Sequence, residues 1–253
     1  MNGGRRRAAR VPRLHVDAAL VAGETLALPQ APSRHLLEVL RARAGDPVCL
    51  FNGDGHDYPA ELVEGGRVAR LHVAARLVNA RESPFELTLV QGVSRGDRMD
   101  ATVRQAVELG VARIVPVRTR LGRVALDERR AAKRHAHWRA IVVSACEQCG
   151  RARLPSLEPL DTLEGWLDRF DAGAGAGLVL APDAERGIGD ASLDGHGATL
   201  LVGPESGLDG AEIETAERAG LRAVRFGPRV LRTETAGPAA LAVLQARHGD
   251  LGG

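Results

Sequence analysis

The sequence of 253 residues has few cysteines, one lysine and no long apolar run. Its three cysteines are an odd number at low density, which argues against a disulfide framework and is typical of a reducing compartment. Cys146 and Cys149 form a lone CxxC without the further ligands that zinc needs. We therefore interpret this pair as structural and expect no metal site.

No window approaches the roughly 20 continuous apolar residues of a membrane span. The first 13 residues are basic but are not followed by the apolar region of a secretory signal. We therefore expect a cytoplasmic protein with no membrane partner. At about 100–200 residues per domain, the length fits one large domain or two smaller ones.

Positive charge is unevenly distributed, although the formal net charge is only +2. Residues 1–13 hold five arginines and no acid, and residues 113–139 hold nine Lys or Arg against Asp127 and Glu128. Such a surplus can neutralise phosphates of a nucleic acid. A frayed tail and a solvated helix face remain open alternatives. Because Lys133 is the only lysine, heavy arginine use also weakens each single arginine as evidence.

The first 78 residues have the pattern of short strands. Apolar segments 48–52 and 58–63 flank a turn rich in Asn, Gly and Asp, which predicts a hairpin, and 69–78 continues the pattern. One short helix is expected at 34–43. Short strands at regular spacing favour a small β-barrel, and the polar segment 79–84, which ends in proline, is a linker.

Strands and helices alternate beyond the linker. Apolar runs of the kind buried in parallel sheets occur at 85–93, 111–117, 178–181, 199–202 and 221–226. Asp209 and Glu212 have the spacing of a capping box. This alternation predicts an α/β domain over residues 85–253.

Three loops leave the carboxyl ends of these strands, after Leu180, Val202 and Phe226, where ligands bind in open α/β sheets. The loop 203–208 is rich in small residues that let a flat ligand approach the backbone, although an ordinary turn into a helix fits equally well. The loop 227–236 holds two arginines, a glutamate and two threonines. That density favours a functional site over a simple helix cap with surface charges.

Several segments together carry a resemblance to a known family. They are RHLLEVLRARAGD and LFNGDG, then RESP, QGVSRGDRMDATVRQAVELGVARIVPV and ACEQCGR, and finally LLVGPESGL and GPRVLRTETAGPAALAVLQ. In this order and spacing they make the chain resemble the bacterial 16S ribosomal RNA uridine-N3 methyltransferases, a family of the SPOUT superfamily. The match covers nearly the whole chain.

The resemblance implies a fold that the residue patterns do not establish. Residues 1–78 would form a PUA-like RNA-binding β-barrel, 79–84 a linker, and 85–253 a SPOUT-type α/β methyltransferase domain with a deep trefoil knot. The cofactor would be S-adenosylmethionine, held in the knot of a homodimer. The substrate would be N3 of one uridine in the decoding region of 16S RNA, presented in the small ribosomal subunit.

Methylation at N3 needs a base near the N3 proton or a group that stabilises the uridine anion, which suggests roles for individual residues. Arg232 is expected to hold the uracil carbonyl charge or a phosphate, and Glu234 to act as base or orienting acceptor. Residues expected at the cofactor are Leu180, Leu201, Val202, Gly203, Glu205, Phe226, Gly227, Val230, Leu231, Thr235 and Ala236. Residues expected at RNA are Arg5, Arg6, Arg7, Arg34, Arg95, Arg118, Arg120, Arg123 and Arg151.

One position departs from the family pattern, because Ser206 stands where a glycine is usual. If that position needs a positive φ, serine costs about 1 kcal/mol or more. Three alternatives stay open at this stage. They are a SPOUT methyltransferase acting on another RNA site, a non-catalytic RNA-binding or ribosome-assembly factor, and a dinucleotide-dependent enzyme, which the missing glycine fingerprint disfavours.

Overall fold

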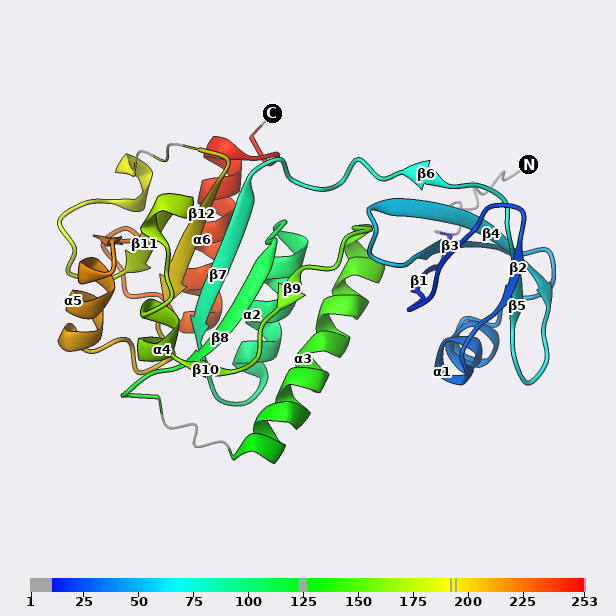
Figure 1. The fold of residues 1–253 in the computed structure, drawn as a ribbon, viewed down its shortest axis with the longest axis horizontal. Coiled ribbons are helices and arrows are strands. Elements are labelled where there is room, and N and C mark those ends of the chain that lie inside the picture. Colours follow the sequence, from blue (N-terminus) through cyan, green and yellow to red (C-terminus); the bar gives the residue numbers. More distant parts are fainter. Residues whose placement is uncertain (1–10, 123–126, 192, 194, 253) are drawn as a thin grey trace, which may run out of the picture. The chain divides into compact units, whose positions relative to one another are not determined.

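The computed structural model describes residues 11–122, 127–191, 193 and 195–252, which fold as two compact units (Figure 1). The N-terminal unit contains Met1–Glu82 together with Cys146–Arg153, and the C-terminal unit contains Ser83–Ala145 and Leu154–Gly253. The division between residues 82 and 83 falls inside the predicted linker 79–84. Residues 146–153, which the sequence analysis assigned to the C-terminal domain, belong instead to the N-terminal unit. Among the described residues, no helix has the length and apolar character to cross a membrane.

The N-terminal unit is built on a six-stranded sheet in the order β1-β3-β4-β5-β2, with β6 paired to β4. Its strands are β1 Arg13–His15, β2 Thr25–Ala27, β3 Pro47–Phe51, β4 His56–Glu64, β5 Arg70–Val73 and β6 Leu77–Val78. β3 and β4 pair antiparallel, which confirms the predicted hairpin. Its turn needs glycine, because Gly53 and Gly55 have φ of 92° and 87°.

The helix predicted at 34–43 has the expected length but starts and ends four residues earlier. It consists of α1 Gln30–Arg34 and the π-helical segment η1 His35–Val39. The chain leaves the helix at Arg41, which has φ of 57°, a backbone conformation that does not continue a right-handed helix. Leu36 is fully buried here in the apolar core of this unit.

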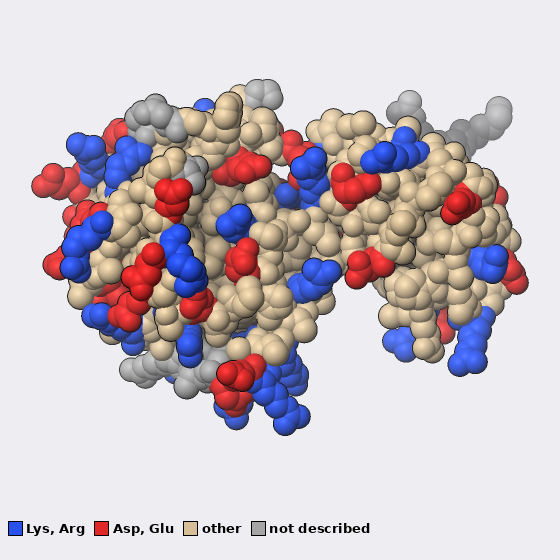
Figure 2. All heavy atoms as spheres, in the orientation of Figure 1, with Lys and Arg blue, Asp and Glu red and all other residues tan. Residues whose placement is uncertain are grey.

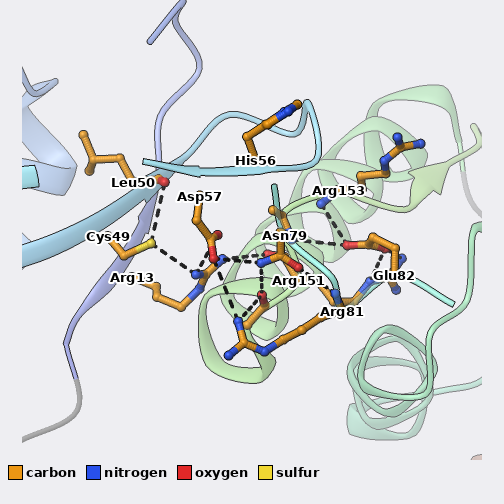
Figure 3. A network of polar contacts seen from close by, with 12 residues as sticks. Arg13, Cys49, Leu50, His56, Asp57, Asn79, Arg81, Glu82, Arg151 and Arg153 are labelled. Atoms are coloured by element: carbon orange, nitrogen blue, oxygen red, sulfur yellow. Dashed lines mark hydrogen bonds and ion pairs between the residues drawn. The ribbon is translucent and has the colours of Figure 1, made fainter. Parts of the chain in front are cut away.

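A polar network ties residues 146–153 into the N-terminal unit (Figure 3). The Arg151 guanidinium donates from Nε and Nη2 to Glu82 Oε2 at 3.0 and 2.8 Å. Asn79 Nδ2 donates to the Gly150 carbonyl at 3.0 Å, and Arg13 Nη2 donates to the Arg151 carbonyl at 3.1 Å. Because these groups lie in three separate chain segments, apolar periodicity does not predict the arrangement.

The C-terminal unit is built on a parallel seven-stranded sheet in the order β10-β8-β7-β12-β11-β13, with β9 beside β8. Its strands are β7 Glu86–Gly92, β8 Arg113–Arg118, β9 Ser156–Leu157, β10 Asp161–Thr162, β11 Ala176–Leu180, β12 Gly197–Val202 and β13 Leu221–Val224. The predicted α/β class and the five predicted strands are confirmed.

Helices cover both faces of this sheet (Figure 1). They are α2 Asp97–Glu108, α3 Glu128–Cys149, α4 Leu163–Leu167, α5 Gly210–Arg218 and α6 Thr233–His248, with short 3₁₀ turns η2 Ala172–Ala174 and η3 Ile188–Asp190. α6 packs against α2, β7 and β12, whereas α5 packs against α4, β11 and β13. The predicted capping box at the start of α5 is present, with Asp209 and Glu212 bonded reciprocally.

Candidate active site

A pocket of about 770 Å³ lies at the carboxyl edge of the parallel sheet. Its lining comes from the three loops that the sequence analysis singled out, after β11, β12 and β13, and from the start of α6. Parallel strands all end at one edge, so segments distant in sequence meet there. Beyond the predicted residues, the lining includes Arg98, Asp183, Pro204, Ser206, Arg229 and Thr233.

The loop after β12 passes very close to the end of β7. A Cβ built on Gly92 would lie 2.5 Å from Pro204 Cδ and 2.6 Å from Pro204 N. In this loop the positive φ belongs to Gly207, at 77°, whereas Ser206 is not among the residues with positive φ. Ser206 therefore carries no backbone strain of this kind. Its hydroxyl donates to the Leu121 carbonyl at 2.9 Å.

Gln91, the buried residue before Gly92, connects the loop after β12 to α6. Its Nε2 donates to the Gly203 carbonyl at 3.2 Å and to Thr233 Oγ1 at 3.0 Å. The Thr233 hydroxyl in turn donates to the Gly203 carbonyl at 2.8 Å. Gln91 and Thr233 are 0% and 5% exposed, so water does not compete for these hydrogen bonds. The triangle fixes two sides of the pocket relative to each other.

Arg98, in the first turn of α2, faces two pocket carboxylates. Its Nη1 lies 3.5 Å from Glu205 Oε1, and its Nε lies 3.8 Å from Glu234 Oε2. The Arg95 backbone N–H also donates to Glu205 Oε1 at 3.3 Å. Glu234 Oε2 is buried and accepts no hydrogen bond from the part of the chain that the structure describes. The pocket therefore holds the Arg98 cation between the Glu205 and Glu234 carboxylates. Both Arg98 and Glu234 can form further hydrogen bonds with a ligand.

Arg232 is the N-cap residue of α6, and its carbonyl accepts from the N–H groups of Thr235 and Ala236. Its side chain is exposed, and among the described residues it has no hydrogen bond or ion pair. Arg232 and Glu234 both line the pocket, on the same first turn of α6. The pocket thus brings the two predicted catalytic side chains to one place.

Most residues predicted at the cofactor line the pocket. They are Leu180, Val202, Gly203, Glu205, Phe226, Gly227, Val230, Leu231 and Ala236. The other two do not: Leu201 is fully buried in the apolar core, and Thr235 is exposed on α6.

The residues predicted at RNA are distributed differently. Arg34, Arg95 and Arg118 are exposed, whereas Arg120 is ion-paired with Glu164 at 2.8 Å. Arg5, Arg6, Arg7 and Arg123 lie outside the described residues. Arg151 has a side chain only 7% exposed and is paired with Glu82, so its charge is already neutralised inside the N-terminal unit. We therefore remove Arg151 from the candidate RNA contacts.

Figure 2 shows Lys and Arg side chains gathered where α3 begins, with acidic side chains among them. Arg129, Arg130 and Lys133 are exposed there, and Arg130 pairs with Asp127 at 3.5 Å. Exposed basic side chains are therefore present where α3 begins, and the charge of Arg130 is balanced by Asp127.

Sequence reasoning missed Arg98 and Gln91, although each carried a signal. Gln91 is a polar residue at the end of a buried strand, which is the criterion that selected the other loops. Arg98 directly precedes Met99, the first buried residue of α2, and its carboxylate partners are more than 100 residues away. No local pattern reveals such a distant pairing.

Comparisons with known proteins agree with this architecture. A model of the RNA methyltransferase domain family matches residues 81–245, and a model of the RNA methyltransferase PUA domain matches residues 29–73. Ribosomal RNA small subunit methyltransferase E of Mycobacterium bovis is 32% identical over 212 residues, covering 82% of this chain and 80% of the relative. The Buchnera aphidicola (Schizaphis graminum) protein of that name is 29% identical and covers 96% of this chain and 98% of its own length.

Solved structures give the same result. The structure of ribosomal RNA small subunit methyltransferase E from Neisseria gonorrhoeae, bound to S-adenosyl methionine, has a TM-score of 0.89 and 38% identity, and covers 95% of this chain and 99% of its own. A Legionella pneumophila methyltransferase in complex with the bound cofactor SAM has a TM-score of 0.92 and 34% identity, covering 96% and 100%. With its PUA-like unit and its SPOUT-type α/β unit, the chain belongs to the family of ribosomal RNA small subunit methyltransferases E.

Proposed function

We propose that this protein uses S-adenosylmethionine to methylate N3 of a specific uridine in the decoding region of 16S ribosomal RNA, within the small subunit. The observation that carries the proposal is the pocket at the carboxyl edge of the sheet, which combines loop backbone, Arg232 and Glu234. Family membership supports the reaction class, and a ribosomal substrate is consistent with a cytoplasmic protein.

The pocket fits the cofactor by size and chemistry. Its volume, about 770 Å³, lies within the roughly 300–1,000 Å³ typical of ligand sites. Leu180, Val202, Phe226 and Leu231 offer apolar surface to an adenine ring. Glu205 can accept from ribose hydroxyls or an ammonium group, and polar backbone at Gly203 and Gly227 can complete the contacts. Val230, Ala236 and the backbone of Leu201 remain further candidates.

The proposed chemistry requires loss of the uridine N3 proton. When bound, S-adenosylmethionine supplies a methyl group on a positively charged sulfur, so that the N3–C bond forms as the C–S bond breaks and its electron pair stays on sulfur. Glu234 takes the N3 proton, because its carboxylate lines the pocket and its side chain is 22% exposed. Arg232, the N-cap residue of α6, has an exposed side chain that lines the pocket and holds the uracil carbonyl charge or a phosphate. A base stacked in RNA must leave its stack to reach them.

We also propose the trefoil knot and the homodimer that the resemblance implies. The close approach of the loop after β12 to Gly92 is consistent with a compactly threaded chain. The RNA contacts that we retain are Arg34, Arg95, Arg118 and Arg120, with Arg5, Arg6, Arg7 and Arg123 outside the described residues.

The test is to incubate the protein and S-adenosylmethionine with small subunits that lack the modification, and to map methylated nucleosides by mass spectrometry. N3-methyluridine at one decoding-region position is the expected product. A different methylated nucleoside or RNA position would replace the proposed site with another RNA target. Failure to bind S-adenosylmethionine, with RNA binding retained, would indicate a non-catalytic assembly factor instead.

Arg232→Ala gives a second test of the same proposal. The side chain is exposed and makes no ion pair with any residue that the structure describes, so the variant should fold with an unchanged melting temperature and lose methylation. Full activity in this variant would remove Arg232 from the mechanism.

A further inference from the structure

We propose that Arg98 is a catalytic residue, whose guanidinium donates hydrogen bonds to a uracil carbonyl oxygen as negative charge develops there. The inference rests on the proposed function and refines it. Arg98 then stabilises the negative charge on the uracil carbonyl oxygen, and Arg232 binds a backbone phosphate of the RNA.

The first argument is that the Arg98 guanidinium is held in the pocket without being saturated. A guanidinium has five N–H donors, yet among the described residues Arg98 makes two long ion pairs, at 3.5 and 3.8 Å, and its side chain donates no hydrogen bond. Its side chain is 44% exposed and lines the pocket. Arg151, in contrast, is 7% exposed and donates twice to one carboxylate, as a structural arginine does.

The second argument is that two carboxylates fix the position of the Arg98 guanidinium before substrate binds. Glu205 comes from the loop after β12 and Glu234 from the start of α6, so the two anions hold the guanidinium from two sides. Glu205 is itself fixed by the Arg95 backbone N–H. A donor fixed before the substrate arrives needs no reorganisation during the reaction, which is the condition under which such groups accelerate reactions most.

The third argument is complementarity with the base. The Watson–Crick edge of uracil presents one N–H donor between two carbonyl acceptors. The pocket presents the Glu234 carboxylate, whose side chain is 22% exposed, beside a guanidinium donor, Arg98 Nε. When the N3 proton passes to Glu234, the charge left on the ring spreads onto the carbonyl oxygens, where Arg98 is the adjacent cation. Glu234 and Arg98 thus match the hydrogen-bonding groups of the neutral uracil edge and also the charge of the uracil anion.

The experiment compares Arg98→Met and Arg98→Lys with wild type in single-turnover methylation. Small subunits are reconstituted from unmodified 16S RNA containing either uridine or 5-fluorouridine, whose N3 loses its proton more readily. Arg98→Met should slow methylation of the uridine substrate about 10²–10³-fold, as loss of one such donor does. Its S-adenosylmethionine affinity should stay within about threefold of wild type. The defect should shrink on the fluorinated substrate, and Arg98→Lys should recover part of the rate.

Arg104→Met is the matched control, since Arg104 is exposed on the same helix and has no partner among the described residues. An undiminished rate in Arg98→Met would overturn the inference. An equal defect on both substrates would also overturn it, because a merely positioning role does not depend on the acidity of N3. If the wild-type protein forms no N3-methyluridine, the proposed function itself fails instead.

Discussion

Gly92 and Pro204 are in such close contact that no side chain fits between them: a Cβ on Gly92 would lie 2.5 Å from Pro204 Cδ. Gly92→Ala should therefore displace the loop after β12. We expect a loss of about 1–3 kcal/mol of stability, as in other overpacked cores, and a larger loss of S-adenosylmethionine affinity. Thermal unfolding and calorimetric titration measure the two effects. Gly66→Ala is the control, because nothing lies within 4 Å of its Cβ position; equal behaviour of the two variants would contradict the argument.

Gln91→Leu should uncouple the loop after β12 from α6. It keeps an apolar stem but removes the Gln91 hydrogen bonds to the Gly203 carbonyl and the Thr233 hydroxyl, so that only the hydrogen bond from Thr233 to Gly203 remains of the triangle. Each lost hydrogen bond costs about 0.5–1.5 kcal/mol, which denaturant unfolding would detect. Gln105→Leu, on the exposed face of α2, should change stability little. Cofactor affinity should fall only in the Gln91 variant, and an unaltered affinity would show that the triangle does not shape the pocket.

The loop residues Ser206 and Gly207 should respond differently to alanine. Gly207 has φ of 77°, so Gly207→Ala adds about 1–2 kcal/mol of backbone strain. Ser206→Ala loses one exposed hydrogen bond to Leu121 and should cost less. Calorimetric titration with S-adenosylmethionine measures how much cofactor affinity each variant loses, and Ser206→Gly is included for comparison. If Ser206→Ala is the more damaging change, the hydrogen bond matters more than the backbone conformation.

Arg151→Met should destabilise the N-terminal unit without changing the salt dependence of RNA binding. Loss of the charged hydrogen bonds from Arg151 costs about 1.5–3 kcal/mol, because the Glu82 carboxylate keeps only its hydrogen bonds from the Ala152 and Arg153 N–H groups. The exposed pair of Arg113 and Glu158, at 4.0 Å, provides the control: Arg113→Met should cost about 1 kcal/mol or less. A flatter dependence of RNA affinity on salt in Arg151→Met would return this arginine to the RNA-contacting set.

Cys146 should make the protein less stable in alkali. Burial raises the pKa of this thiol to about 12 from its ordinary value of 9.0. The folded state therefore favours the neutral thiol, and the stabilisation is complete below pH 9.0 and is lost as the pH rises toward 12. Between pH 9 and 11, stability of the wild type should fall more steeply than that of Cys146→Ala. Parallel curves would mean that the thiol ionises equally in both states.

The sequence predicted those parts of the molecule that depend on local pattern. Alternating apolar runs identified the parallel sheet, and the rule that ligands bind beyond the carboxyl ends of strands selected the three loops that line the pocket. The spacing of Asp209 and Glu212 predicted a capping box that is present. Each of these features is set by residues within one helical turn or one strand.

The parts that escaped prediction depend on residues that are distant in sequence. Glu82 and Arg151 form one buried pair, and Arg98 meets Glu205 and Glu234 across two loops. Ser206 was suspected of strain, but the positive φ belongs to its neighbour Gly207. Single-sequence periodicity contains no information about which distant charges meet or which residue of a loop turns.

The N-terminal unit is discontinuous in sequence, so it cannot be completed until residues 146–153 have been synthesised. Its sheet is encoded before residue 82, yet Cys146–Arg153, which supply the partner of Glu82, are synthesised only after residues 83–145. An emerging chain therefore exposes an incomplete first unit while part of the second is already outside the ribosome. Contacts closed across such long loops slow folding. Folding of the N-terminal unit therefore depends on synthesis of much of the C-terminal unit. A fragment that ends at the linker would lack Cys146–Arg153, which belong to the N-terminal unit.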